Sequence, residues 1–277
     1  MKTLEELLET EAIPQVFSDT VLKLSGALSD NECGIDDVVD IIKYDQAVTA
    51  RVLRYANSSV SSSRRDINSL REAVIRLGGG RILEWLMAEC LQGVLNRPLV
   101  KYGFKENELW RHSIAAASAA ESLHEMFGSR IEMVTFTSAL LHDIGKLLLA
   151  NSLPDDICLL LWKIEEGKPF EEVEKELFGF THADIGAALL ERWNLPSDIV
   201  HVVKHHHDSD QLQISDCSLK VADILAHLIG EGLGYSGLCM AVSEKPCVRL
   251  GIKREHLERL LASTRYRFEN VIRSFES

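Results

Sequence analysis

Apolar residues recur along this chain at the three- and four-residue spacing of an α-helix, and sustained alternation of apolar and polar residues is missing from the sequence. The run formed by Val38, Ile41 and Ile42, continued by Val48 and Val52, is an example. Positions three and four residues apart lie on the same helix face, so this spacing lets each helix turn one face toward a core. The sequence therefore predicts an all-α protein built as a multi-helix bundle.

The composition sets limits on the partners of such a bundle. The chain has 277 residues, of which 46% are apolar and 26% charged, which is enough to bury a sizeable core. Its formal net charge of -12 argues against nucleic acid as a partner, because phosphate neutralisation needs a concentrated basic surface. The cysteines include no Cys-x-x-Cys pair, so neither a zinc ribbon nor a disulfide framework is indicated.

The sequence carries no sign of export or of membrane insertion. The first residues, MKTLEELLETEAIPQ, are acidic and amphipathic, unlike the basic and then apolar pattern of a secretory signal. The longest apolar stretches fall far short of the roughly 20 residues that a membrane helix needs. We therefore expect a cytoplasmic protein without membrane contact.

A second region of the sequence begins near Arg97-Pro98. We predict an N-terminal helical region over residues 1–97 and a second helical region over 98–277 that ends in C-terminal helices. In the first region Ser69 is expected to cap a helix that runs to Leu77 and stops in a turn at Gly78-Gly79-Gly80. A loop is expected over 208–215. Helices in the second region are predicted over 108–127, 131–151, 155–166, 170–177, 182–193, 197–206 and 218–229.

Histidines and carboxylates gather in the second region, on segments that are otherwise apolar. The candidate metal ligands are His112, His142, Asp143, His182, His206, His207 and Asp223. Several helices could each direct one or two of these side chains inward, which is how helical proteins build metal sites. Neighbouring residues lie about 100° apart around a helix. The His142-Asp143 pair could therefore hold one ion, or its carboxylate could bridge two, and His206-His207 could likewise face two ions.

A single histidine on an apolar helix face is more often a hydrogen-bonded core residue than a ligand, so the prediction depends on the combination. The remaining histidines show no partner pattern, and we interpret them as structural or surface residues: His124, His201, His205, His227 and His256. The sequence leaves one alternative open. A shift of the helical register by one residue would turn His205-His206 inward in place of His206-His207.

The ordered series His112, His142-Asp143 and Asp223 resembles the H…HD…D signature of the HD superfamily of metal-dependent phosphohydrolases. This resemblance covers about half the chain. It implies that these four residues bind metal.

The first region is similar, more specifically, to the HDOD family. The similarity lies in DIIKYDQAVTARVLRYANSS at 40–59 and INSLREAVIRLGG at 67–79, and LFGFTHADIGAALLERWNLP at 177–196 fits it as well. Small departures are present, since Asp45-Gln46 stand where the family usually has Asp-Pro, and Gly79-Gly80 where a bulkier residue is common. The resemblance implies a signalling or output module. Many members of the HDOD family have lost the HD ligands that this chain keeps.

The related HD-GYP phosphodiesterases add a further comparison. His182 and His206-His207 match the histidines that complete a two-metal site in those enzymes. The GYP motif is missing after the double histidine, where this chain reads DSDQLQIS, and Gly234-Tyr235-Ser236 lies on the wrong side of Asp223 and is expected to be a flexible loop. This departure argues against hydrolysis of a cyclic dinucleotide.

Two functions follow from these resemblances. The favoured one is an HDOD-type signal transduction or regulatory module that acts through signalling protein partners and carries a structural or sensory metal site. The alternative is a metal-dependent phosphohydrolase acting on a phosphoester or nucleotide. One or two divalent ions of iron, manganese or zinc suit the mixed nitrogen and oxygen ligands, whereas calcium and magnesium favour oxygen alone. In the enzyme Asp143 would orient the nucleophilic water and Lys146 would face the phosphate, although Lys146 could equally be a surface lysine.

Overall fold

The computed structural model describes residues 3–10, 16–28, 33–57, 67–128, 131, 134–154, 168–208, 213–235, 237 and 243–276. Within these ranges the chain forms helices and turns without a β-strand, and a single isolated bridge joins Leu99 to Phe104. The predicted all-α fold is therefore confirmed.

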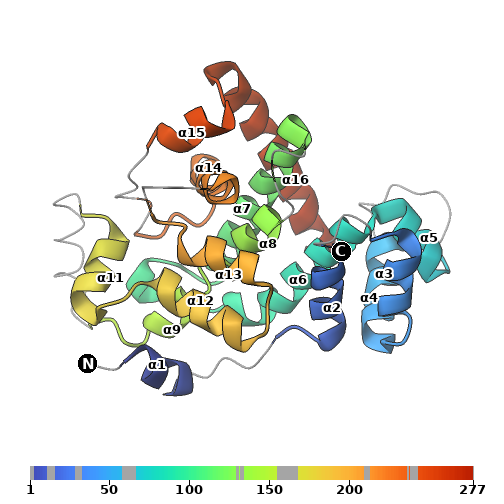
Figure 1. Ribbon diagram of the computed structural model, residues 1–277, viewed down its shortest axis with the longest axis horizontal. Coiled ribbons are helices and arrows are strands. Elements are labelled where there is room, and N and C mark those ends of the chain that lie inside the picture. The colour runs from blue at the N-terminus through green and yellow to red at the C-terminus, as the bar shows by residue number, and fades with distance from the viewer. Residues whose placement is uncertain are drawn as a thin grey trace.

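Most of the N-terminal helices lie together at one end of the molecule (Figure 1). Their bounds are α1 Leu4–Thr10, α2 Asp19–Leu28, α3 Ile35–Ile42, α4 Gln46–Asn57, α5 Leu70–Leu77 and α6 Gly79–Leu95. Helix α1 lies apart from this group, against α9 and α12. The apolar stripe seen in the sequence is the packed face, since Val38 and Ile42 of α3 and Val48 and Val52 of α4 are all buried. Helix α6 leads from this group toward the rest of the chain (Figure 1).

The second group of helices surrounds α7. Their bounds are η2 Val100–Tyr102, α7 Glu108–Phe127, α8 Val134–Leu141, α9 Lys146–Leu149, α11 Phe170–Phe178, α12 His182–Arg192, α13 Ser197–Lys204, α14 Ile214–Leu228, α15 Lys245–Leu250 and α16 Arg254–Glu276. Helix α7 packs against α8, α14 and α16. It is buried on several faces, and small residues such as Ala115, Ala116 and Ala119 keep it thin enough for its neighbours to approach.

The start of α6 differs from the prediction. Ser69 caps α5 as expected, with its hydroxyl accepting a hydrogen bond of 3.2 Å from the backbone N–H of Glu72. Of the three glycines that follow, however, only Gly78 leaves the helical conformation, with φ of +81°, and Gly79 and Gly80 already belong to α6. A Cβ on Gly79 would lie 2.9 Å from Val38 Cγ2, so the absence of a side chain lets α6 pack closely on α3.

The predicted helix over 131–151 is wrong. The chain forms α8, a turn over 142–145 and then α9, so His142 and Asp143 stand on a turn. At this turn Gly145 lies against α12, where a Cβ would overlap the carbonyl oxygen of His182.

The predicted loop over 208–215 is also wrong at its end, because α14 begins at Ile214 and not at residue 218. The Asp216 carboxylate accepts a hydrogen bond of 2.8 Å from the Gln213 backbone N–H and so fixes this earlier start. The helices predicted over 108–127, 170–177, 182–193 and 197–206 agree with the structure to within two residues at each end. The one predicted over 155–166 lies outside the described residues.

The C-terminal helix connects the two regions. Phe275 on α16 lies 5.8 Å, between ring centroids, from Trp85 of α6 and 5.1 Å from Trp110 of α7. Residues of both regions contribute to one hydrophobic core. The division of the chain at residues 97 and 98 stays a prediction.

The described residues bear on two predictions from the sequence, one about membrane helices and one about cysteines. Among them, no helix has both the length and the apolar character that crossing a membrane requires. Among the cysteines that they include, Cys90, Cys217 and Cys247 are free thiols, with Cys217 buried and the other two half-buried.

Gly145→Ala is expected to destabilise the protein by about 1–3 kcal/mol or more, because the added methyl group meets backbone atoms of α12 that cannot rotate away. Gly93→Ala is the matched control, since Gly93 is exposed on α6 and a Cβ there meets nothing within 4 Å. That control should stabilise the protein by about 0.5–1 kcal/mol. Urea unfolding followed by circular dichroism measures both, and an unchanged midpoint for Gly145→Ala would contradict the close approach.

Candidate metal centre

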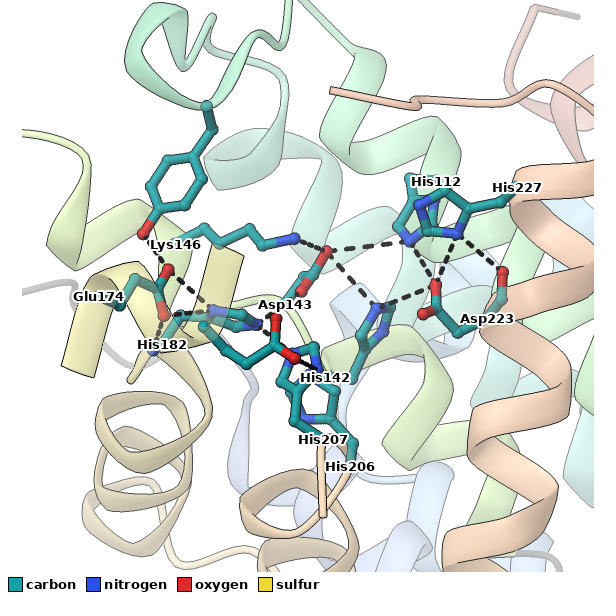
Figure 2. A network of polar contacts seen from close by, with 12 residues as sticks. His112, His142, Asp143, Lys146, Glu174, His182, His206, His207, Asp223 and His227 are labelled. Carbon is teal, nitrogen blue, oxygen red and sulfur yellow. Dashed lines mark hydrogen bonds and ion pairs between the residues drawn. The ribbon is translucent and has the colours of Figure 1, made fainter. Parts of the chain in front are cut away.

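The predicted ligands meet in the interior, although they come from segments far apart in the sequence. Helix α7 supplies His112, the turn after α8 supplies His142 and Asp143, and α12 supplies His182 at its first position. The turn after α13 and the middle of α14 supply the remaining residues, which are His206, His207 and Asp223. Figure 2 shows these side chains pointing toward one another. His207 and Asp223 are half-buried and the other five are buried.

The first group of ligand atoms surrounds His112. Its Nε2 lies 3.0 Å from Asp223 Oδ1 and 3.8 Å from Asp143 Oδ2. His142 Nε2 lies 3.5 Å from the same Asp143 oxygen and 3.8 Å from Asp223 Oδ1. Asp223 Oδ1 is buried, and imidazole nitrogens of His112 and His142 both lie within 4 Å of it. Two imidazole nitrogens and two carboxylates thus converge on one small volume.

The second group lies on the other side of Asp143. Asp143 Oδ1 is 3.3 Å from His182 Nε2, and His182 Nε2 is 2.9 Å from His207 Nε2. His206 Nε2 is buried without a hydrogen-bond partner in the part of the chain that the structure describes. Ligand atoms of His182, His206 and His207 all lie within 4.8 Å of one another. The Asp143 carboxylate therefore faces both groups, one oxygen to each.

Backbone carbonyl groups set the orientation of three rings. His142 Nδ1 donates to Ala139 O at 2.8 Å and His206 Nδ1 donates to Val203 O at 2.6 Å. His112 Nδ1 lies 3.1 Å from Glu231 O. A carbonyl oxygen can only accept, so in a neutral imidazole the proton sits on Nδ1 and Nε2 presents its lone pair to the cluster. Such a partner behind the ring is typical of metal-binding histidines.

Glu174 contacts the cluster of candidate ligands, and the sequence analysis missed it. It is fully buried on α11, and its Oε2 lies 2.7 Å from His182 Nδ1 while also accepting from the His182 backbone N–H at 2.7 Å. Tyr102 donates its hydroxyl hydrogen to Glu174 Oε1 at 2.7 Å. A signal was present in the sequence, because Glu174 falls in the apolar helical spacing of Phe170, Val173 and Leu177, where a charge is unexpected.

His227 also lies at the cluster, although the sequence showed no partner for it. Its Nδ1 is 3.1 Å from Asp223 Oδ1, and its ring centroid is 4.7 Å from that of His112. Its position one helical turn after Asp223 could have indicated this, because residues four apart share a helix face.

The sequence left open which two residues of the run from His205 to His207 face inward. His205 Nδ1 pairs with Asp208 Oδ2 at 2.6 Å, away from the cluster. The inward pair is therefore His206-His207.

Lys146 is buried, so its interpretation as a surface lysine is wrong. Its Nζ lies 2.6 Å from Asp143 Oδ2 and above the rings of Tyr102 and Phe104. Figure 2 shows this ammonium group reaching the same carboxylate that the histidines face. The site thus places the Lys146 ammonium group beside the buried Asp143 carboxylate.

Burial and neighbouring charges shift the pKa values of these groups. Burial lowers the pKa of His142, and that of His206 and His207 falls well below the ordinary value. Burial alone would raise the pKa of Asp143, but His142 and Lys146 outweigh it and hold that pKa well below its usual range. Burial would likewise lower the pKa of His182, yet Glu174 and Asp143 raise it to about 9. These shifts favour neutral imidazoles at His142, His206 and His207, a protonated His182 and an ionised Asp143 carboxylate.

This donor set fits a divalent transition-metal ion. Imidazole nitrogen with carboxylate oxygen is the ligand chemistry of iron, manganese and zinc. The buried and unpaired Nε2 of His206 fits the same interpretation, since an unsatisfied buried acceptor costs free energy unless something binds it.

Comparison with known proteins supports a family and a fold. The family model of the HDOD domain matches residues 13–209. An uncharacterized protein of Treponema pallidum (strain Nichols) is 26% identical over 198 residues, which are 71% of this chain and 38% of that protein. This chain therefore spans well under half the length of that relative.

Solved structures with the same fold include three informative cases. An HDOD domain protein of unknown function from Geobacter sulfurreducens is 26% identical with a TM-score of 0.68, over 94% of this chain and 87% of that one. A candidate phosphohydrolase from Shewanella amazonensis SB2B is 22% identical with a TM-score of 0.67, over 97% of both chains.

A candidate signal transduction protein from Marinobacter aquaeolei VT8 is 21% identical with a TM-score of 0.74, over 98% of this chain and 60% of that one. At the identities of the Shewanella and Marinobacter proteins, the likeness is one of fold.

Tyr102→Phe is expected to lower the free energy of unfolding by about 1–3 kcal/mol, because it removes a hydrogen bond to a carboxylate that is fully buried. Tyr266→Phe is the matched control, since Tyr266 is 69% exposed. Urea unfolding should show a lower midpoint for the first variant and no change for the second. Equal midpoints for Tyr102→Phe and the wild type would show that Glu174 does not need this donor.

Proposed function

The chain belongs to the HDOD family, and from this premise we propose that it is a signal transduction or regulatory module whose second region binds one or two divalent transition-metal ions. The observation that carries the proposal is the buried convergence of histidine nitrogens on both oxygens of Asp143. The buried Nε2 of His206, which has no hydrogen-bond partner among the described residues, supports the same proposal.

The geometry suggests two sets of ligands that share Asp143. One ion would be held by His112, His142 and Asp223 together with Asp143. A second would be held by His182, His206 and His207 with the other oxygen of Asp143. Iron, manganese and zinc are the metals that suit these ligands.

The regulatory role is favoured over catalysis for a reason of chemistry. A metal centre enclosed by helices does not by itself provide a site for a substrate, and function has to be argued from the site. A structural or sensory ion would fix the relative positions of α7, α12 and α14, the helices that carry His112, His182 and Asp223. We propose that the module transmits its state to protein partners in the cytoplasm, with neither membrane nor nucleic acid involved.

A phosphohydrolase is the second candidate, and Lys146 is the observation that favours it. Its buried ammonium group lies 2.6 Å from Asp143 Oδ2, where a positive charge could also meet a phosphoryl oxygen of a phosphoester or nucleotide. A bound ion would supply Lewis acidity and lower the pKa of a water molecule. In this proposal Asp143 orients that water and Lys146 neutralises the phosphate, and these two are the catalytic residues.

Metal content tests the proposal directly. Purified wild-type protein should contain about one or two equivalents of iron, manganese or zinc by plasma mass spectrometry. His206→Ala should lose the second ion, because it removes a ligand with no other partner, whereas His205→Ala should keep the wild-type content because that side chain pairs with Asp208. A wild-type protein that binds none of these metals after refilling would refute the metal proposal.

Turnover distinguishes the module from the enzyme. The metal-loaded protein would be tested against nucleotides and generic phosphodiesters. If it is an enzyme, Asp143→Ala should abolish turnover and Lys146→Met should reduce kcat by about 10²-fold. His205→Ala serves as the matched control and should remain active. Bound metal without turnover across the panel would leave the regulatory module as the function.

A further inference from the structure

Asp223 is the least enclosed of the four residues proposed to hold the first ion. Its side chain is 22% exposed, whereas those of His112, His142 and Asp143 are between 1% and 3% exposed. A carboxylate at the edge of a site has room to rotate, and rotation would turn Oδ1 away from the other ligands. Preorganised sites prevent this with neighbouring side chains that lock the rotamer of the ligand.

The two imidazoles that face Asp223 across the ligand cluster offer it no hydrogen when they are neutral. His112 Nε2 lies 3.0 Å from Asp223 Oδ1, and His142 Nε2 lies 3.8 Å from it. In both rings Nδ1 faces a backbone carbonyl oxygen and carries the proton, so Nε2 turns a lone pair toward Oδ1. These two rings can share an ion with Asp223, but by themselves they do not hold its carboxylate in place.

His227 supplies an N–H group to Asp223. Its Nδ1 donates to the Asp223 backbone carbonyl at 2.9 Å, and because a carbonyl oxygen only accepts, Nδ1 carries a proton in the neutral and in the charged ring alike. The same nitrogen lies 3.1 Å from Asp223 Oδ1. Figure 2 shows His227 contacting both the main chain and the carboxylate of Asp223. The contact is possible because the two residues are four apart on α14 and share one face of it.

The ring of His227 is itself held by its neighbours. Its side chain is only 10% exposed, and its centroid lies 4.7 Å from that of His112 with 67° between the ring planes. A Cβ built on Gly237 would lie 3.4 Å from His227 Cδ2, so the chain also passes close to another edge of the ring. Contacts on two sides restrict the rotation of the imidazole and keep Nδ1 directed at Asp223.

We propose that His227 is a positioning residue of the metal centre, whose Nδ1–H holds the Asp223 carboxylate with Oδ1 turned toward His112 and His142. The inference rests on the proposed metal site and adds to it a residue that acts through Asp223. His227 does for this carboxylate what Glu174 does for the ring of His182. Partners of this kind behind metal ligands change metal affinity by about 10–100-fold when they are removed.

Zinc titration of the full chain tests this role. The His206→Ala background is expected to hold the first ion alone and so gives a single affinity to measure. In that background His227→Phe should weaken zinc binding by about 10–100-fold, because phenylalanine keeps a ring but has no N–H. His227→Asn should recover most of the affinity, since its amide N–H can take the place of Nδ1–H although the ring is lost.

His124→Phe is the matched control. His124 is also a half-buried histidine whose Nδ1 pairs with a backbone carbonyl, that of Ile131 at 2.8 Å, but it has no contact with a candidate ligand among those described. This variant should bind zinc like its His206→Ala parent, and circular dichroism would confirm that every variant is folded.

The possible outcomes separate this inference from the metal site on which it rests. Equal zinc affinity of His227→Phe and its parent would overturn the positioning role and leave the metal centre in place. Equally weak binding by His227→Phe and His227→Asn would also overturn it, because the ring and not the N–H would then be required. A wild-type chain that binds no zinc or other divalent transition metal would refute the metal centre and this inference with it.

Discussion

The buried carboxylate of Asp143 is the group around which the second region is organised. A carboxylate taken out of water is costly unless cations and hydrogen bonds compensate it. Lys146 lies 2.6 Å from one oxygen and His182 lies 3.3 Å from the other. These neighbours come from α9 and α12, and His112 on α7 faces the same group. Several helices must therefore keep their relative positions for this one negative charge to remain stable.

The scaffold around the cluster has features that preserve its geometry. Carbonyl groups of Ala139 and Val203 hold the rings of His142 and His206 from behind. Glu174 does the same for His182 and is itself fixed by Tyr102, so the chain of support reaches η2 in the sequence segment before α7. Close approach of the backbone at Gly145 brings the turn that carries Asp143 against α12. Hydrogen bonds of this kind behind the ligands are typical of metal sites and are not expected where histidines lie close together by chance.

The choice between a regulatory module and a phosphohydrolase depends on what the centre does once an ion is bound. The same ligands can fix helices in place or activate a water molecule, and Lys146 is consistent with either role because it already neutralises Asp143. A cavity of about 470 Å³ lies apart from this centre, and none of the candidate ligands lines it. Helix α7 contributes residues to both places.

The sequence by itself determined the fold class and the identity of the seven candidate ligands, because helical periodicity and the order of the histidines and aspartates can be read without knowing the tertiary contacts. It could not give the break in 131–151 or the start of α6 at Gly79, since both depend on contacts with α12 and with α3. Only the tertiary structure brought Glu174 and His227 to the cluster, buried Lys146 and chose His206-His207 over His205-His206. The physical reason is that spacing fixes which face of a helix a side chain occupies. What that face meets is decided by segments tens of residues away.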